Sequence, residues 1–355
     1  MRNLFVNSLL LFYNKMGCCG STIWNDDTAK AFKTVWYDDY EKTFGNATNK
    51  VIAITGCTTG TGYHLAKFAL RKEASVIMLN RNSERHDRAF KSLKELFPNG
   101  TLTHIPCDLS SFESVRNAAK ELRSLCEKNG LDILACNAGV MAFPDEATID
   151  GYDIQMQTNH LSHFLLLSET FSLLETAANQ NGEARVIMHS SLARQGGSPP
   201  LQEKYFGKNG GDLGGDGASM LCGGARWKRY HQTKLANIIF AQALHQRLRL
   251  KNSKVKSLVA APGLAATNLQ VTTGEKKGMS EFWIMKYGQS AADGTMPLIC
   301  CCFHPDAQCG DFYEPVKKAK GLPVKTIVKA KEKSEAGMKL LWEHSEKACD
   351  VKFEI

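Results

Sequence analysis

The sequence predicts a single α/β domain with a doubly wound parallel sheet, and three observations lead to that prediction. Short apolar segments alternate regularly with longer amphipathic segments from residue 50 onward. The short segments are largely apolar throughout, which is typical of strands buried on both faces of a parallel sheet. The alternation continues without a break in composition, so we assign residues 50–355 to one domain and residues 1–49 to an N-terminal extension.

Each predicted strand is a mainly apolar run that is followed within two positions by proline or a polar residue. The predicted strands lie at 51–54, 75–79, 102–105, 131–135, 185–189 and 255–260. The helices follow the 3.6-residue spacing of apolar side chains, and serines and glycines bound several of them. For one helix, Ser110 or Ser111 is the expected N-cap and Gly130 marks the end. The predicted helices lie at 65–70, 83–96, 111–128, 152–177, 230–250 and 334–348.

The N-terminal extension carries two unusual segments. Residues 4–13 are mostly apolar, and Arg2 and Lys15 flank them. This pattern fits a targeting signal, an amphipathic membrane contact or a helix packed on the domain. Residues 16–21 read Met-Gly-Cys-Cys-Gly-Ser, which would be a myristoylation signal beside two palmitoylatable cysteines if Met16 were the start; as written, Gly17 is internal.

Composition excludes several classes of protein. Twelve cysteines among 355 residues are too few for a disulfide scaffold, and adjacent cysteines such as 300–302 indicate free thiols in a reducing compartment, cytoplasmic or organellar. No apolar run approaches the ~20 residues that span a bilayer. The net charge is +8, and six lysines without an acid lie between residues 317 and 331. Arginines and aromatics are absent there, so we expect no nucleic-acid partner; a solvated face or a peripheral membrane contact remains open.

A glycine-rich turn follows the first predicted strand. Residues 55–62 read Thr-Gly-Cys-Thr-Thr-Gly-Thr-Gly and open a helix. Glycines let the backbone approach a pyrophosphate closely, and the helix N-terminus supplies free N–H groups. The strand–turn–helix context makes this a dinucleotide-binding signal. Cys57 inside the turn is either a buried neutral thiol or a redox-sensitive one.

The second predicted strand ends at Asn80-Arg81 rather than at an acid. An acid at this position binds the ribose 2′-hydroxyl of NAD, whereas an arginine can pair with the 2′-phosphate of NADP. We therefore expect NADP(H) as the preferred cofactor, with NAD(H) as the alternative.

Tyr230 and Lys234 are four residues apart on a predicted helix and share one face. Tyrosine has an ordinary pKa near ~10, and a neighbouring ammonium lowers it by stabilising the phenolate. The pair therefore predicts a tyrosine activated for proton transfer.

With these motifs in place, the sequence resembles a short-chain dehydrogenase/reductase of the retinol-dehydrogenase-like and WW-domain-oxidoreductase-like group. The resemblance runs from about residue 50 to the end and implies a Rossmann-type fold. It rests on seven blocks in order: 55–62, Cys-Asp-Leu at 107–109, Cys-Asn-Ala-Gly-Val-Met at 136–141, Asn-His-Leu-Ser-His-Phe at 159–164, Ser-Ser at 190–191, 230–234, and Pro262-Gly263 with Thr267. Cys136 departs from the asparagine that is frequent in relatives.

The resemblance implies a role for each residue of the catalytic set. Tyr230 is implied as the acid/base and Ser191, the second of its pair, as the hydroxyl that polarises the substrate oxygen. Lys234 is implied to bind the nicotinamide ribose, and Asn159 to hold a water in the proton relay. The expected cofactor-binding residues are Gly56, Thr58, Thr59, Gly60, Thr61, Gly62, Asn80, Arg81, Asp108, Leu109, Asn137, Ala138, Gly139, Tyr230, Lys234, Pro262, Gly263 and Thr267.

The implied activity is hydride transfer between nicotinamide and a carbonyl or alcohol carbon, on a lipophilic retinoid- or steroid-like substrate. The glycine-rich insertion at 195–226 is the expected lid over the site. A long glycine-rich interval before the tyrosine also occurs in light-dependent protochlorophyllide reductases, so reduction of a C=C bond in a pigment-like substrate is one alternative. A non-catalytic nucleotide-binding scaffold is another. We expect no metal site, because three consecutive cysteines at 300–302 lack the paired spacing of zinc ligands.

Overall fold

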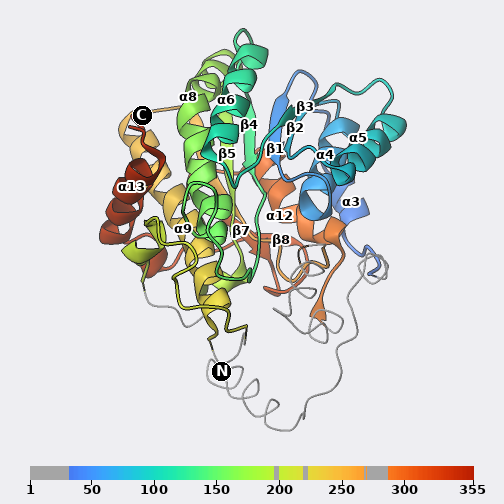
Figure 1. Ribbon diagram of the computed structural model, residues 1–355. Helices are drawn as coiled ribbons and strands as arrows, with labels where there is room; N and C mark the ends of the chain where they lie inside the picture. Colours follow the sequence, from blue (N-terminus) through green and yellow to red (C-terminus); the bar gives the residue numbers. More distant parts are fainter. Residues whose placement is uncertain (1–31, 196–199, 219–222, 268, 270–286) are drawn as a thin grey trace.

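An eight-stranded sheet runs through the centre of the computed structural model (Figure 1). The structure describes residues 32–195, 200–218, 223–267, 269 and 287–355. The segments 4–13 and 16–21 lie outside the described residues. The strand order is β3-β2-β1-β4-β5-β6-β7-β8. The strands are β1 (Val51–Thr55), β2 (Ser75–Asn80), β3 (Leu102–Pro106), β4 (Ile133–Cys136), β5 (Ala184–His189), β6 (Val255–Ala260), β7 (Phe312–Pro315) and β8 (Pro323–Lys325).

The sheet is parallel except for β8, which pairs with β7 in the antiparallel sense. The strand order reverses between β1 and β4, which pair through Ile52–Ile133 and Ile54–Ala135. In doubly wound sheets, ligands bind in the crevice outside the carboxyl ends of the strands at such a reversal. The predicted fold class and the six predicted strands are therefore confirmed, and the glycine-rich turn after β1 lies at the expected place.

Helices cover both faces of the sheet (Figure 1). The apolar side chains of α3, α4, α5 and α12 pack together on one face, and those of α6, α8, α9 and α13 on the other. The first group is α3 (Tyr37–Lys42), α4 (Gly60–Arg71), α5 (Glu84–Leu96) and α12 (Ala291–Phe303). The second is α6 (Phe112–Cys126), α8 (Ser162–Asn181), α9 (Ala225–Leu250) and α13 (Glu335–Cys349). The core thus lies in two layers, one on each side of the sheet.

Serine side chains begin three of the predicted helices. Ser83 accepts a hydrogen bond from the His86 amide in α5, and Ser111, rather than Ser110, accepts one from Ser114 in α6. Ser334 does the same for α13 through the Gly337 amide. These side chains satisfy N–H groups that the first helical turn leaves without a partner.

Two predicted helices differ from the structure. The helix expected at 230–250 begins earlier, at Ala225, with Gly224 as its N-cap. The helix expected at 152–177 is interrupted: α7 (Ile154–Met156) leads into a π-helix at Gln157–Leu161, and α8 follows. A π-turn inserts one residue without changing the apolar pattern much, so the spacing of apolar residues does not reveal it.

Part of the N-terminal extension packs on the domain. The Asp293 carboxylate in α12 accepts hydrogen bonds from the amides of Val35, Trp36 and Tyr37 at 3.0, 2.9 and 2.9 Å. These bonds fix the start of α3, which the sequence did not predict. The described part of the extension is therefore attached to the same face as α4 and α12.

Two lysines of the basic stretch are engaged in ion pairs. Lys318 pairs with the buried Glu314 at 2.5 Å, and Lys325 pairs with Asp311 at 2.6 Å. None of the helices in the described ranges is both long enough and apolar enough to cross a membrane.

Candidate active site

The turn after β1 forms a glycine-lined cradle at the N-terminus of α4. Gly56 and Gly60 have φ of 66° and 59°, a conformation that glycine adopts without strain. A Cβ on Gly62 would lie 2.3 Å from the Gly56 carbonyl oxygen, so no side chain fits there. Thr59 is the N-cap and makes no side-chain cap bond, which leaves the first-turn amides available to an anion. The cradle therefore has the form of a phosphate-binding site.

The hydroxyl of Thr55 joins this cradle to the turn after β4. It accepts hydrogen bonds from the amides of Asn137 and Ala138, both at 3.0 Å. The Asn137 side chain in turn donates to the carbonyls of Thr55 and Gly56, both at 3.0 Å, and accepts from the Thr61 hydroxyl at 2.9 Å. Sequence reasoning placed Asn137 and Ala138 beside the cofactor and included Thr55 in the glycine-rich motif, but it did not predict that Thr55 links the two turns.

Asn80 and Arg81 have different surroundings at the end of β2. The Asn80 side chain is buried and accepts a hydrogen bond from the Cys57 amide at 2.9 Å, so it braces the glycine turn. Arg81 is exposed at the adjacent position. The Cys57 thiol donates to the Ile54 carbonyl at 3.3 Å, and burial raises its pKa to about 12. Cys57 is therefore a neutral, shielded thiol rather than a reactive thiolate.

Tyr230 on α9 lies close to the side chain of Ser191, which follows β5 and acts to lower the pKa of the tyrosine. The neighbouring Ser190 hydroxyl instead donates to the Lys234 carbonyl at 2.8 Å, so Ser190 secures the chain against α9. Burial raises the pKa of Tyr230 to about 12, although Ser191 lowers it in part. The pKa of Tyr230 is thus raised rather than lowered as expected, because burial outweighs the effect of the Ser191 hydroxyl.

Lys234 lies beside this pair and has no carboxylate partner among the described residues. Its ammonium donates to the His189 carbonyl at 3.2 Å and lies 5.8 Å from the centroid of the Tyr230 ring. Burial lowers the pKa of Lys234 to about 8. A Cβ on Gly139 would lie 3.3 Å from the Lys234 ammonium, so the glycine keeps the space beside the lysine open.

Asn159 lies in the π-turn, and its side chain hydrogen-bonds to the backbone of the turn after β4. Its Oδ1 accepts from the Val140 amide at 2.7 Å, and its Nδ2 donates to the Val140 carbonyl at 2.9 Å. Nδ2 also donates to the Thr233 hydroxyl at 2.9 Å, which connects Asn159 to the helix of Tyr230 and Lys234. The structure therefore brings the four predicted catalytic residues together from three different elements.

Pro262, Gly263 and Thr267 follow β6. Gly263 has φ of 68°, and a Cβ there would lie 2.4 Å from the Ala319 carbonyl oxygen. The Pro262 carbonyl accepts from the Gln289 side chain at 2.8 Å. A Cβ on Gly60 would lie 3.1 Å from Thr267, which places Thr267 against the glycine cradle.

Asp108 and Leu109 follow β3 at the outer side of the cradle. Asp108 accepts hydrogen bonds from the amide and hydroxyl of Ser110, at 2.9 and 2.7 Å. Leu109 is buried, and its carbonyl accepts from the Ser162 hydroxyl at 2.7 Å. Both residues are thus fixed in position by the start of α6 and by α8.

A small apolar cluster surrounds Tyr230. Met141, Ala142 and Trp227 are buried against it, and the Trp227 and Tyr230 ring centroids are 5.9 Å apart in an edge-to-face arrangement. Met141 belongs to the block at 136–141, but the sequence did not place it, Ala142 or Trp227 beside the tyrosine, because no spacing rule links the turn after β4 to the start of α9. These apolar side chains therefore pack around the tyrosine.

The cysteine run at 300–302 is buried in α12, where burial raises the pKa of each thiol above its ordinary value. Within the described ranges, no group of three or more His, Cys, Asp or Glu side chains could hold a metal ion.

Comparisons with known proteins extend this description. A protein-family model described as short chain dehydrogenase matches residues 50–203. An uncharacterized oxidoreductase of Schizosaccharomyces pombe is 34% identical over 224 residues, which cover 62% of each chain. Retinol dehydrogenase 14 of Mus musculus is 34% identical over 232 residues, again 62% of each. The chain thus spans less than two thirds of these relatives' length. A crystal structure of an uncharacterized protein from Mycobacterium paratuberculosis superposes with a TM-score of 0.69 at 25% identity, over 89% of this chain and 98% of that one.

Proposed function

We propose that the chain is a short-chain dehydrogenase/reductase and that it catalyses NADP(H)-dependent hydride transfer to the carbonyl carbon of a lipophilic substrate. The family model and the relatives named oxidoreductase and retinol dehydrogenase support this proposal. One observation carries the proposal: Ser191, Tyr230, Lys234 and Asn159 converge beside a glycine cradle at the reversal of the sheet. A dinucleotide and a reacting carbonyl would therefore share one site, with the pyrophosphate held by the cradle.

The residues present fit a dinucleotide. The cradle of Gly56, Gly60 and Gly62 excludes side chains where a pyrophosphate would lie, and the free amides of α4 point toward it. Arg81 is exposed where the 2′-phosphate of NADP would be met, and no described acid replaces it at the end of β2. Lys234 would hold the nicotinamide ribose. When bound, the nicotinamide supplies the hydride.

The protein side chains would polarise and protonate the substrate oxygen. The Ser191 hydroxyl holds and polarises the substrate oxygen, and Tyr230 donates its phenolic proton to that oxygen as negative charge develops there. Lys234 places a positive charge beside Tyr230. Asn159 keeps the turn after β4 in place and connects it to α9 through Thr233.

The protonation state of Tyr230 fits the role of a proton donor. With a pKa of about 12, the phenol is neutral at physiological pH and can protonate the oxygen of an aldehyde or ketone. The same side chain accepts the proton in the reverse reaction, so the concentrations of cofactor and substrate decide the direction of turnover.

A lipophilic substrate is supported by the apolar cluster of Met141, Ala142 and Trp227 around the tyrosine. The relative from mouse is named a retinol dehydrogenase. A reducing compartment fits the described cysteines, all nine of which are free thiols.

The proposal is tested by a panel of apolar aldehydes and ketones, with consumption of NADPH and of NADH followed side by side. We expect turnover with NADPH and weaker turnover with NADH. Binding of NADPH without turnover on any member would contradict the proposal and favour a nucleotide-binding scaffold. Light-dependent reduction of a C=C bond in a pigment would favour the alternative reductase.

A further inference from the structure

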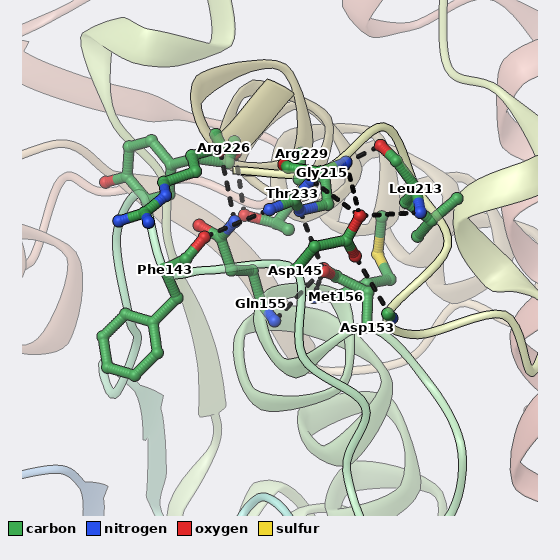
Figure 2. A network of polar contacts seen from close by, with 12 residues as sticks. Phe143, Asp145, Asp153, Gln155, Met156, Leu213, Gly215, Arg226, Arg229 and Thr233 are labelled. Atoms are coloured by element: carbon green, nitrogen blue, oxygen red, sulfur yellow. Dashed lines mark hydrogen bonds and ion pairs between the residues drawn. The ribbon is translucent and has the colours of Figure 1, made fainter. Parts of the chain in front are cut away.

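The carboxylate of Asp145 accepts hydrogen bonds from three backbone amides of the glycine-rich insertion (Figure 2). It accepts hydrogen bonds from Gly211 at 3.1 Å and from Leu213 and Gly215 at 2.8 Å each. The Asp145 amide donates to the Asp216 side chain at 2.6 Å. Three backbone amides of this part of the insertion are therefore satisfied by one side chain on the segment that follows β4.

Arg229 satisfies the acceptors of the same segment. Its side chain is fully buried and donates to the carbonyls of Gly215 at 3.0 Å and Leu213 at 3.4 Å. It also donates to the Phe143 carbonyl at 3.2 Å and pairs with Asp145 at 3.4 Å. Figure 2 shows these groups converging from the insertion, from the segment after β4 and from α9. Arg229 directly precedes Tyr230, so the insertion is joined to the helix that carries the proposed proton donor.

Arg229 also forms an ion pair with the N-cap residue of α7, the short helix that precedes Asn159. Arg229 pairs with Asp153 at 3.2 Å, and both side chains are fully buried. Asp153 is the N-cap of α7 and accepts from the amides of Gln155 and Met156 at 3.1 and 2.8 Å. That short helix leads directly into the π-turn of Asn159. One guanidinium thus connects the insertion to the helices of both Tyr230 and Asn159.

The end of the described insertion positions Trp227. The Arg226 amide donates to the Gly217 carbonyl at 3.2 Å, and the Trp227 indole donates to the Ala218 carbonyl at 3.1 Å. Trp227 is 3% exposed and packs edge to face against Tyr230, which is also 3% exposed. The indole therefore limits the space beside the tyrosine.

We propose that residues 211–218 of the glycine-rich insertion form a fixed wall of the substrate site rather than a lid, with Asp145 and Arg229 as positioning residues and Trp227 as the specificity-determining side chain. The inference rests on the proposed carbonyl reduction. Because Trp227 packs against Tyr230, the wall would leave room for a carbonyl with one bulky substituent but not for a carbonyl with two. The favoured substrates are therefore unbranched apolar aldehydes rather than internal ketones of the same length.

Trp227→Ala tests the wall through selectivity. We compare kcat/KM for decanal and for 5-decanone, because a change of a few methylenes in a pocket alters this ratio by about 10–200-fold. We expect the aldehyde-to-ketone ratio to fall by about tenfold or more in Trp227→Ala and to recover in Trp227→Phe. An unchanged ratio in Trp227→Ala, with decanal reduction retained, would overturn the role of Trp227.

Asp145→Asn tests the clamp, by which we mean the hydrogen bonds from Gly211, Leu213 and Gly215 to the Asp145 carboxylate. Asp212→Asn is the matched control, because Asp212 is exposed in the same segment. Hydrogen exchange at the amides of Gly211, Leu213 and Gly215 should become at least about tenfold faster in Asp145→Asn and stay unchanged in the control. Unchanged exchange in Asp145→Asn would overturn the clamp, whether or not the protein turns over. A wild-type protein that reduces no carbonyl would refute the proposed function, and hydrogen exchange would still decide the clamp.

Discussion

The Thr55 hydroxyl lies 2.9 Å from Nε2 of His163, although 108 residues separate the two. His163 Nδ1 lies 3.1 Å from the Asn159 carbonyl, so Nδ1–H donates there and Nε2 accepts from Thr55. Thr55 in turn accepts from the amides of Asn137 and Ala138. This chain of bonds joins the π-turn of Asn159 to the glycine cradle, and it requires a neutral imidazole. Burial lowers the pKa of His163 to about 4, which keeps the ring neutral at physiological pH.

Replacing His163 should weaken cofactor binding as well as stability. His163→Phe leaves the Asn159 carbonyl and the Thr55 hydroxyl without their partner, at a cost of ~1–3 kcal/mol in the free energy of unfolding. We expect the Kd for NADPH, measured by fluorescence titration, to rise by about tenfold. His160→Phe is the matched control, since His160 is equally buried but bonds to Ser345 on α13. Equal NADPH affinity in the two variants would argue against the connection.

Acid should destabilise the protein through its buried histidines. Burial lowers the pKa values of His160, His163 and His189 to about 3, 4 and 3, below the ordinary value of 6.5. Between pH 6.5 and 4 the unfolded chain binds these protons and the folded chain does not. The free energy of unfolding therefore falls as pH falls, by up to ~1.4 kcal/mol per pH unit for each histidine.

The carboxyl group of Asp153 opposes this decrease in the free energy of unfolding. Burial raises the pKa of Asp153 to about 6, so the folded chain takes up its proton first and offsets about one histidine below pH 6. Urea unfolding at pH 7, 6 and 5 measures the combined effect of these groups on the free energy of unfolding. In His160→Gln, the number of protons taken up on unfolding, which sets the pH dependence of this free energy, should fall by about one. A free energy of unfolding that stays constant over this range would show that the histidines are protonated in the folded protein.

Gly62→Ala should damage the cradle without a general loss of the fold. The added Cβ would meet the Gly56 carbonyl oxygen at 2.3 Å and the Asn137 side chain at 2.4 Å, so the turn must shift. We expect the Kd for NADPH to rise by about tenfold or more. Gly45→Ala is the control, because nothing lies within 4 Å of its added Cβ. Similar Kd values for both variants would place the pyrophosphate elsewhere.

Charge reversal at Arg81 should change the cofactor preference. A charge-assisted bond to the 2′-phosphate is worth about 1.5–3 kcal/mol, so the ratio of kcat/KM for NADPH over NADH should fall by at least about tenfold in Arg81→Asp. Arg88→Asp is the matched control, because Arg88 lies on α5 with a side chain that is 72% exposed. If both variants lower the ratio equally, the effect is one of general surface charge.

The sequence predicted the parts of the fold that depend on local pattern. The six central strands and the serine caps follow from short runs of residues. The strands β7 and β8 are only 4 and 3 residues long, and Pro297 lies inside α12, so their patterns gave no signal. Helix α3 depends on the Asp293 carboxylate more than 250 residues away, which no local pattern records.

In the candidate site, too, local pattern reveals some residues but not the contacts between distant segments. Tyr230 and Lys234 are visible as a pair because both lie on one helix. The bonds from Asp145 to the insertion and from Thr55 to His163 link segments that are distant in the chain, and only the folded structure brings them together. The raised pKa of Tyr230 likewise depends on burial by several elements, so the sequence predicted the wrong direction.

Tyr230→Phe tests the central claim most directly. The change removes one oxygen and keeps the ring that packs against Trp227, so folding and NADPH binding should be preserved. Without the phenolic proton, we expect carbonyl reduction with NADPH to fall by about 100-fold or more, while the Kd for NADPH changes less than about threefold. Unchanged turnover in Tyr230→Phe, measured on a substrate that the wild-type protein reduces, would contradict the account.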